Sequence, residues 1–479
     1  MCLPYLLEYQ ARHTPDAPAI LAPGRAALSY GRLYRHVGQN GHALRAMGIG
    51  RHDRVAVALP NGPEMAVAIL SVAATAVCAP MNPVDGSEEL KEFIADLRPR
   101  APLTAVGFNS PARRAALSCG VPVVEISTIG NIEGGLFKST GDEGSRPSDD
   151  SVSPDDVALL FLTSGTTSRP KIVPLTHANI CASAYSSCAV LELRESDRCL
   201  NILPLFHGHG FIGNVLTSLA AGASVVCTPG CDANSFFDWL RTFKPTWYSA
   251  VPTMHQAILA QAQRHSEPAV DQQLRFVRSG SAPLPPRIFA ELEQTFETSV
   301  IEVYGMAEAA SSLVTCNPLP PHRRKIGSVG LPVSLDVAIM DEGGALLSRG
   351  QTGQVVIRGA SVISGYYGDP TASEAAFVGG WFKTGDQGFF DEDGYLFLVG
   401  RSKEIVNRGG EKVAPREVDE VLLEHPAVAE AVTFAVPHPT LGEEVASAIV
   451  LHPRATITPN ELRRFVAERV ASSKSRGNC

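Results

Sequence analysis

Short apolar stretches rich in Val, Ile and Leu alternate with longer stretches of helical period along most of the chain. Apolar runs of about four to eight residues are typical of buried strands, and a period of about 3.6 residues is typical of helices. Their alternation predicts parallel strands joined by crossover helices, and therefore a layered α/β region. The clearest predicted strand and helix pairs are 54–59 with 64–76, 224–228 with 235–243, and 274–279 with 285–296.

The pattern changes from about residue 353, where strands become shorter and turns carry Gly and Asp. Residues 391–394 (D-E-D-G) separate two apolar runs and predict a hairpin. Beyond residue 402 the chain predicts helices at 416–424 and 459–470 and strands at 428–436 and 446–451. Thr458 and Glu461 form a capping box at the start of the last helix. We therefore expect a large α/β domain over 1–401, with layered subdomains and a small β-rich part, and a small α+β domain over 402–479.

The longest apolar run, 65–79, is shorter than the roughly 20 residues that a membrane-spanning helix needs. It predicts a buried core helix that ends at Pro80, and we expect no integral membrane segment. The first nine residues lack the basic start and the small-residue cleavage site of a secretion signal. Ten cysteines without repeating spacings are not typical of a disulfide framework, so a reducing, cytoplasmic location is expected.

Composition narrows the class of protein further. With 44% apolar and 19% charged residues among 479, the chain has the usage of a globular protein of more than one core. A formal charge of -8 argues against a nucleic-acid-binding surface, which needs clustered Lys and Arg. The basic run 322–325 is interpreted as a solvated loop. Cys227 and Cys231 lack a second ligand pair at zinc-site spacing, so no structural metal site is predicted.

Residues 163–171 (T-S-G-T-T-S-R-P-K) follow an apolar strand predicted at 157–162. Their hydroxyl groups and the backbone amides around Gly165 can donate to phosphate oxygens, and Lys171 adds a positive charge. The G-x-x-x-x-G-K-S/T spacing of a Walker loop is absent. The stretch therefore predicts a different kind of nucleoside triphosphate loop, although Ser, Thr, Gly and Pro alone would also suit an ordinary surface loop.

Further motifs decide between these two interpretations. The run L-T-S-G-T-T-S-R-P-K-I-V-P-L-T-H resembles the signature loop of the adenylate-forming superfamily, which includes acyl-CoA synthetases, luciferases and peptide-synthetase adenylation domains. Four later segments resemble its other signatures in the same order: Y-G-M-A-E at 304–308, K-T-G-D at 383–386, G-R-S-K-E at 400–404 and N-R-G-G-E-K at 407–412. The resemblance covers almost the whole chain. It implies activation of a carboxylic acid with ATP and Mg²⁺, followed by transfer to coenzyme A.

The resemblance also assigns roles to individual residues. Tyr304 is expected to stack on adenine, Asp386 and Arg401 to reach the ribose, and Glu308 to bind Mg²⁺. His207, at an acyl-gating position, is grouped with Thr167 and Lys412 as catalytic. The other expected nucleotide or CoA contacts are Thr163, Ser164, Gly165, Thr166, Thr167, Lys171, Gly280, Ser281, Ala282, Gly305, Gly409 and Gly410.

Rotation of the small domain is a further implication of the resemblance. Lys403 resembles the family's hinge position, and the segment 407–412 resembles the part that meets the CoA arm in the second step. A domain that turns about one residue can present two surfaces to one site. His207 and His209 flank Gly208 in an apolar setting that would also suit core histidines, and the resemblance assigns the acyl-gating role to the His207 position.

Two positions depart from the family pattern. Ala307 stands where the family usually has a Thr whose hydroxyl contacts the α-phosphate or the carboxylate. The closing P-K-T-x-x-G-K motif with its catalytic lysine is not found after the last predicted helix, and Lys474 lies in a different context. The small domain is accordingly expected to be truncated. A slow adenylation step, with thioester formation preserved, is expected as well.

The motifs S-G-T-T-S-R-P-K, T-G-D-Q-G and I-V-N-R-G-G-E-K look closest to the oxalate–CoA ligase branch, which acts on a very small dicarboxylate. That branch has a His where this chain has Ser311, so an aliphatic or aryl acid stays open as an alternative. The acceptor is expected to be CoA or, alternatively, a phosphopantetheinyl carrier protein. The absent lysine motif also leaves open a non-catalytic nucleotide-binding protein.

Overall fold

A computed structural model describes residues 1–85, 88–108, 110–128, 133–140, 151–163, 171–264, 274–311, 313–409 and 411–476. The chain divides into two compact units. The large unit comprises Met1–Arg324, Gly330–Asp336 and Arg358–Ala376, and the small unit comprises Lys325–Val329, Val337–Ile357 and Phe377–Cys479. The predicted domain boundary at residue 401 stays a prediction. Residues 139–154, whose Ser, Asp and Gly content without periodicity predicts a surface connection, lie mostly outside the described residues.

The first sheet of the large unit is mostly parallel, and in the described ranges its order is β16-β15-β14-β13-β12-β10-β11-β1-β2. Neighbouring strands from β14 to β1 run parallel, while β2, β15 and β16 are antiparallel edges. The predicted parallel sheet is therefore confirmed. Its strands are β1 (Pro18–Leu21), β2 (Leu28–Ser29), β10 (Arg198–Asn201), β11 (Ser224–Cys227), β12 (Trp247–Ala250), β13 (Phe276–Ser279), β14 (Ser299–Tyr304), β15 (Thr315–Cys316) and β16 (Leu331–Pro332).

The second sheet of the large unit has the order β7-β6-β5-β3-β4-β8-β9 in the described part of the chain. The strands from β6 to β8 run parallel, and β7 and β9 are antiparallel at the edges. This sheet carries the predicted phosphate loop between its last two strands. Its members are β3 (Arg54–Ala58), β4 (Val77–Pro80), β5 (Ala101–Ala105), β6 (Val124–Thr128), β7 (Phe137–Thr140), β8 (Val157–Thr163) and β9 (Lys171–Thr176).

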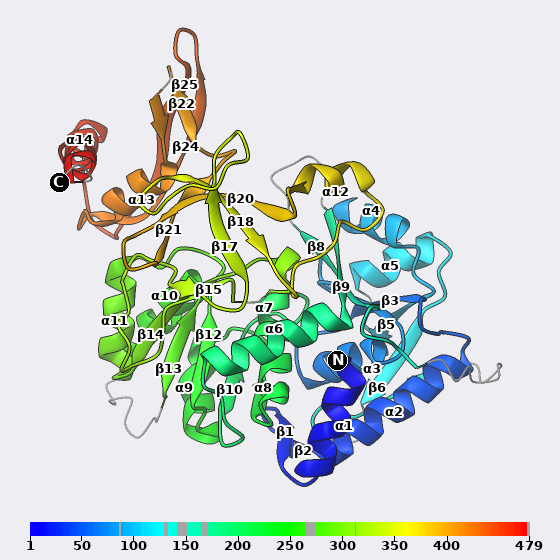
Figure 1. The fold of residues 1–479 in the computed structure, drawn as a ribbon. Coiled ribbons are helices and arrows are strands. Elements are labelled where there is room, and N and C mark those ends of the chain that lie inside the picture. The colour runs from blue at the N-terminus through cyan, green and yellow to red at the C-terminus, as the bar shows by residue number, and fades with distance from the viewer. Residues whose placement is uncertain are drawn as a thin grey trace. The chain divides into compact units, whose positions relative to one another are not determined.

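Helices pack against both sheets of the large unit (Figure 1). Phe236, Ile258 and Leu292, from three successive crossover helices, share one buried cluster with the strands of the first sheet. The helical elements are α1 (Leu3–His13), α2 (Tyr30–Ala46), α3 (Pro63–Ala73), α4 (Glu88–Leu97), α5 (Pro111–Ser118), α6 (His177–Val190), α7 (Gly208–Gly210), η1 (Phe211–Leu216), α8 (Thr217–Ala220), α9 (Ala233–Phe243), α10 (Pro252–Ala262), α11 (Pro286–Phe296), η2 (Ala307–Ala309) and α12 (Pro370–Ala376). No helix among the described residues has the length and apolarity to cross a membrane.

The apolar run 65–79 was predicted as one core helix, and that prediction is wrong in its second half. Helix α3 ends at Ala73, and β4 begins at Val77 after a short turn. The strand pairs in parallel with β3 and β8, so both its faces are buried. A strand buried on both faces and a buried helix are both continuously apolar, which is why the pattern alone did not separate them.

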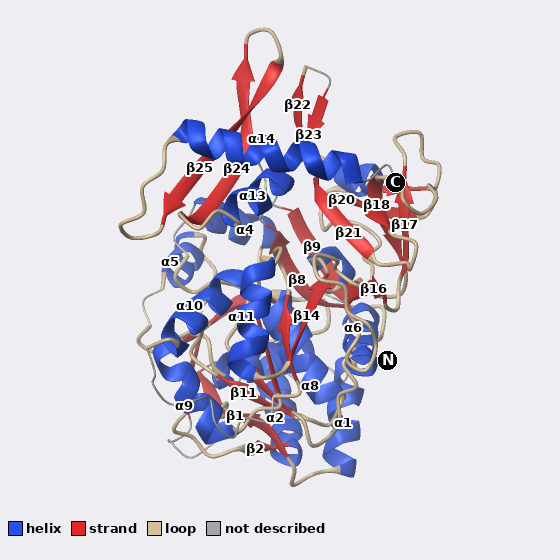
Figure 2. Ribbon diagram, turned by 90° about the vertical axis from the view of Figure 1, so that its left-hand side faces the viewer, coloured by secondary structure: helices blue, strands red, loops and turns tan. Residues whose placement is uncertain are grey.

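The small unit contains two sheets and two helices within the described residues (Figure 2). Strands β20 and β21 form the predicted hairpin, in which Phe389 pairs with Phe397. Thr458 and Glu461 form the predicted capping box, with Glu461 Oε2 2.8 Å from the amide of Thr458. The elements are β17 (Asp336–Met340), β18 (Gly353–Arg358), β19 (Phe377–Val378), β20 (Trp381–Phe390), β21 (Leu396–Arg401), β22 (Val406–Arg408), β23 (Glu411–Val413), α13 (Pro415–Leu423), β24 (Val428–His438), β25 (Gly442–Leu451) and α14 (Pro459–Arg476).

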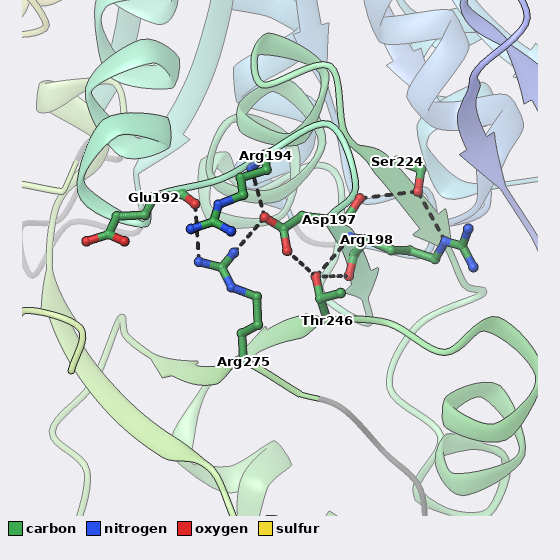
Figure 3. A network of polar contacts seen from close by, with 7 residues as sticks. All are labelled: Glu192, Arg194, Asp197, Arg198, Ser224, Thr246 and Arg275. Carbon is green, nitrogen blue, oxygen red and sulfur yellow. Dashed lines mark hydrogen bonds and ion pairs between the residues drawn. The ribbon is translucent and has the colours of Figure 1, made fainter. Parts of the chain in front are cut away.

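A buried carboxylate ties together the segments that lead into β10, β12 and β13 of the first sheet (Figure 3). Asp197 accepts hydrogen bonds from Nη1 of Arg275 at 2.6 Å, from the hydroxyl of Thr246 at 2.7 Å and from the amide of Arg194 at 2.8 Å. Its side chain is 2% exposed. The charge is compensated by Arg275 and by two neutral donors, as a buried ion requires. This cluster fixes the strand register at the edge opposite the carboxyl ends that carry the predicted site.

Candidate functional site

The carboxyl ends of β13 and β14 bring several predicted nucleotide contacts together. The two strands are parallel neighbours, with Ser279 opposite Glu302. Gly280, Ser281 and Ala282 therefore continue from one strand beside Tyr304, which ends the other. A Cβ on Gly280 would lie 2.8 Å from Cγ2 of Val303, so the segment after β13 approaches β14 closely at this point. Ligands of open α/β sheets bind outside such carboxyl ends, which agrees with the predicted adenine contacts.

Behind this edge lies a buried polar network formed by Arg278, Asn214, Ser249, His209 and Ser281, called here the Arg278 network. Arg278 is 1% exposed and donates to Oγ of Ser249 at 2.9 Å and to Oδ1 of Asn214 at 2.6 Å. Burial lowers the pKa of Arg278 to about 10, so the guanidinium keeps its charge at neutral pH. In the described part of the chain its recorded hydrogen-bond partners are neutral oxygens.

His209 extends this network to the surface residue Ser281. Its Nε2 lies 2.7 Å from Oγ of Ser249, and its Nδ1 lies 2.9 Å from Oγ of Ser281. Burial and the nearby guanidinium of Arg278 hold the pKa of His209 well below its ordinary value. The imidazole is therefore neutral near pH 7, with one ring nitrogen protonated and the other free to accept.

The direction of donation follows from the guanidinium. Arg278 can only donate, so Ser249 accepts from it and has one proton of its own to give. Oγ of Ser249 also lies 3.2 Å from the carbonyl oxygen of Arg278, but the shorter 2.7 Å contact favours donation of its proton to Nε2 of His209, which would place the ring proton on Nδ1. Nδ1 then donates to Ser281, whose own hydroxyl proton is left for an acceptor outside the network. Ser281 is exposed and has a φ of 69°, a left-handed conformation that costs a non-glycine residue strain and is common at ligand sites.

The predicted phosphate loop connects two paired strand ends. Thr163 at the end of β8 pairs with Lys171 at the start of β9, and its hydroxyl donates to the carbonyl oxygen of Lys171 at 3.1 Å. Ser164, Gly165, Thr166 and Thr167 lie outside the described residues. The ammonium of Lys171 lies 4.4 Å from the ring centroid of Tyr366, a cation–π contact.

Glu308, the predicted Mg²⁺ ligand, lies in η2, the short helix that follows β14. Its Oε1 accepts a hydrogen bond from the hydroxyl of Tyr366 at 3.0 Å, and its carbonyl accepts from the amide of Ile363 at 2.9 Å. Among the described residues no group of three or more His, Cys, Asp or Glu could hold a metal ion by itself. A single half-exposed carboxylate with one oxygen fixed by a donor fits Mg²⁺, which takes one or two carboxylates together with waters and substrate phosphates.

His207 and Ser311 belong to the predicted acyl end of the site. His207 is exposed, and its ring lies 4.5 Å from that of Phe206. A Cβ on Gly208 would lie 2.0 Å from Oγ of Ser311 and 3.8 Å from Phe161, so these three residues are direct neighbours. The Ser311 hydroxyl therefore lies beside the turn between the two histidines.

The remaining predicted residues lie in the small unit. Asp386 pairs with Arg401 across β20 and β21, with Oδ1 3.6 Å from Nε, so these two predicted ribose contacts lie side by side. Gly409 has a φ of 61° in the turn between β22 and β23, and its amide donates to the carbonyl of Leu441. Lys403 is exposed. Gly410 and the side chain of Lys412 lie outside what the structure describes.

Three residues that the sequence interpretation did not select are part of this arrangement. Tyr366 contacts two predicted site residues, and Ser249 and Arg278 orient His209. An arginine within the apolar strand at 276–279 was a visible signal, because a buried charge needs a polar partner. Tyr366 had no comparable signal, because it lies in a loop about 60 residues from Glu308 in sequence.

Two parts of this chain match known protein families. Residues 7–367 match the family described as AMP-binding enzyme, and residues 417–476 match the AMP-binding enzyme C-terminal domain. An oxalate–CoA ligase of Arabidopsis thaliana is 41% identical over 481 residues, covering 98% of this chain and 92% of that protein.

A sulfoacetate–CoA ligase of Cupriavidus necator is 35% identical, covering 96% of this chain and 89% of its own length. Among solved structures, o-succinylbenzoate coenzyme A synthetase from Bacillus subtilis in complex with ATP and magnesium ion superimposes with a TM-score of 0.82. It is 26% identical, and the match covers 97% of this chain and 92% of that one. The fold similarity therefore extends over nearly the whole length of both proteins.

Proposed function

This chain belongs to the AMP-binding enzyme family and is an ATP-dependent acid–CoA ligase that acts on a small or dicarboxylic acid, and we propose that its substrate is a two-carbon acid with a second anionic group, such as oxalate. ATP, Mg²⁺ and CoA are the cofactors of this family of ligases. The proposal concerns the identity of the acid and the roles of individual residues.

The reaction runs in two half-reactions. A carboxylate oxygen of the acid attacks the α-phosphorus of ATP, and pyrophosphate leaves with the electrons of the broken P–O bond. The thiolate sulfur of CoA, after loss of its proton, then attacks the carbonyl carbon of the acyl adenylate, and AMP leaves. Neither step needs a covalent nucleophile from the protein, so positioning and charge compensation carry the catalysis.

The contacts of the Arg278 network, and the proton direction we infer from them, carry the choice of acid. This direction leaves Ser281 as a hydrogen-bond donor at the carboxyl end of β13, close to the histidine turn. Ser311 adds a second hydroxyl next to Gly208. Hydroxyl donors supported by a buried cation suit an anionic group better than an aliphatic or aryl tail. Two relatives are named as ligases of oxalate and of sulfoacetate, and both of these are two-carbon acids with two anionic groups.

Nucleotide roles are proposed for the residues at the sheet edge and in the phosphate loop. Tyr304 and the segment Gly280, Ser281 and Ala282 are proposed to hold adenine, and Lys171 is proposed to meet the phosphates. Glu308 is the residue that would hold Mg²⁺, which compensates charge on the phosphate oxygens when it is bound. Asp386 and Arg401 are proposed for the ribose, and their adjacency in the small unit supports this pairing.

A substrate panel tests the proposal directly. Pyrophosphate release and CoA thioester formation are measured with oxalate, sulfoacetate, malonate, acetate and ferulate. We expect kcat/KM for oxalate to exceed that for acetate by at least about tenfold, because acetate lacks the second anion. Ser281→Ala should reduce kcat/KM for oxalate by a larger factor than kcat/KM for acetate, because any loss of adenine binding is common to both acids. Acetate or ferulate as the best substrate would rule out the two-anion proposal.

The acceptor and the compartment are part of the proposal as well. The ligases that resemble this chain are named for CoA, which favours CoA over a carrier protein. Comparing free CoA with a phosphopantetheinylated carrier as acceptor distinguishes the two. A reducing cytoplasm is supported by the free thiols of the described cysteines, Cys2, Cys78, Cys119, Cys181, Cys188, Cys199, Cys227, Cys231 and Cys316.

A further inference from the structure

Tyr366 lies between two residues of opposite charge. Its hydroxyl donates to Oε1 of Glu308 at 3.0 Å, while its ring face lies 4.4 Å from the ammonium of Lys171. One side chain therefore touches both the start of β9, where the phosphate loop ends, and the short helix η2. All three residues belong to the large unit.

The backbone around Tyr366 is fixed to the same elements. The amide of Ile363 donates to the carbonyl of Glu308 at 2.9 Å, and the amide of Tyr366 donates to the hydroxyl of Ser373 at 2.8 Å. The loop that carries the ring is thus attached to η2 on one side and to the start of α12 on the other. A ring held in this way costs little further entropy when it orients a neighbour.

Both charged groups contact Tyr366. Within the described ranges the recorded ion pairs include none between Lys171 and Glu308, and the cation rests on the ring face instead. The hydroxyl contact engages one oxygen of the Glu308 carboxylate, and the ring face contacts the Lys171 ammonium, so one aromatic side chain can orient both charged groups.

We propose that Tyr366 is a positioning residue that orients the Glu308 carboxylate toward a nucleotide-bound divalent cation while it holds Lys171 for the phosphates. The inference rests on the proposed Mg²⁺ role of Glu308 and deepens it. Its consequence is that removal of one hydroxyl group should affect the adenylation half-reaction and spare the thioester half-reaction.

Two substitutions separate the two contacts. Tyr366→Phe removes the hydrogen bond to Glu308 and keeps the ring under Lys171, whereas Tyr366→Leu removes both. Tyr367→Phe is the matched control, because it deletes the hydroxyl of the adjacent tyrosine, whose ring packs on the apolar core of the second sheet. Thermal melting of all variants shows whether they fold as the parent does.

The direct readout is cation binding rather than turnover. The affinity of Mn²⁺ for the ATP complex is measured by electron paramagnetic resonance, and ATP binding without metal by calorimetry. We expect Tyr366→Phe to lower the affinity of the ATP complex for Mn²⁺ by about tenfold, which is typical when a metal ligand loses its hydrogen-bond partner. The affinity for ATP without metal should change by less than about twofold. Tyr366→Leu should lower both the Mn²⁺ affinity and the ATP affinity, and Tyr367→Phe should change neither affinity.

Half-reactions give the second readout. The Mg²⁺ concentration for half-maximal pyrophosphate release should rise by about tenfold in Tyr366→Phe, while thioester formation from a synthetic acyl adenylate changes by less than about twofold. Unchanged Mn²⁺ affinity, or equal losses in both half-reactions, would overturn the inference. A parent enzyme that neither binds Mn²⁺ with ATP nor activates any acid would instead overturn the proposed role of Glu308.

Discussion

His209 and Ser281 come from segments 72 residues apart, yet ring Nδ1 of the one lies 2.9 Å from Oγ of the other. The contact joins the turn after β10 to the carboxyl end of β13. Through Ser249 it continues to the buried guanidinium of Arg278. Among the described residues the hydrogen-bond partners of this cation are neutral oxygens, and burial of a cation with such partners is costly, so function can explain its location behind this edge.

We predict that His209→Phe impairs recognition of the acid more than recognition of the nucleotide. Phenylalanine keeps a ring in place but neither orients Ser281 nor accepts from Ser249. The KM for oxalate should rise by about tenfold, equivalent to about 1.4 kcal/mol, and the KM for ATP should change by less than about twofold. Steady-state kinetics with each substrate varied in turn measure both values. Equal increases in the two constants would indicate general damage to the edge of the sheet.

Ala307 offers a gain of function. Ala307→Thr restores the hydroxyl that the family places there, at the first residue of η2. One donor to a developing negative charge is typically worth about 10² to 10³ in rate, so pyrophosphate release should accelerate by about tenfold or more. Ala307→Val has nearly the same shape without the hydroxyl and should not accelerate the step. If Ala307→Thr and Ala307→Val change the rate of pyrophosphate release equally, then side-chain volume and not hydrogen bonding at position 307 affects that rate.

The stability of the fold should depend on pH through His177, which is fully buried and accepts from the amide of Leu3. Burial lowers the pKa of His177 from 6.5 to about 4. Between these values the unfolded chain binds a proton that the folded chain does not. The free energy of unfolding therefore falls on acidification through this window, by up to about 1.4 kcal/mol per pH unit from this group.

His177→Asn should reduce this pH dependence, because the Asn oxygen can still accept from Leu3 but does not titrate. Melting temperatures at pH 7.5, 6 and 5 test the expectation. Some dependence should persist in the variant, because burial also lowers the pKa of His255, to about 3. Parallel melting curves for the parent and His177→Asn would contradict the assignment to His177.

Substitution of the buried residue Asp197 should strongly lower the free energy of unfolding. Asp197→Ala leaves the Thr246 hydroxyl and the Arg194 amide without their acceptor and Arg275 without its counter-ion. We expect a loss of about 3 kcal/mol in the free energy of unfolding, measured by denaturant titration. Asp238→Ala, which breaks the exposed pair with Arg241, is the control and should change stability by less than about 1 kcal/mol. Similar losses for both variants would refute the special role of the buried cluster.

Sequence by itself determined the class of the fold and the family, and it predicts the phosphate loop. Local periodicity and the order of short motifs are properties of the linear chain, so the strands at 54–58 and 276–279, the hairpin before Tyr395 and the Thr458 cap were all predictable. The run 65–79 was not, because an apolar helix and a doubly buried strand look alike until a neighbouring strand pairs with one of them.

Only the tertiary structure decided which distant side chains meet. The contacts of Tyr366 with Glu308 and Lys171 join residues that are 58 and 195 positions apart, and the Arg278 network joins segments from α7, η1, β12 and β13. No local pattern encodes such contacts, because they depend on how parallel strands bring their carboxyl ends to a common edge. The motifs in the sequence predict the reaction, and tertiary packing determines which residues orient the reacting groups.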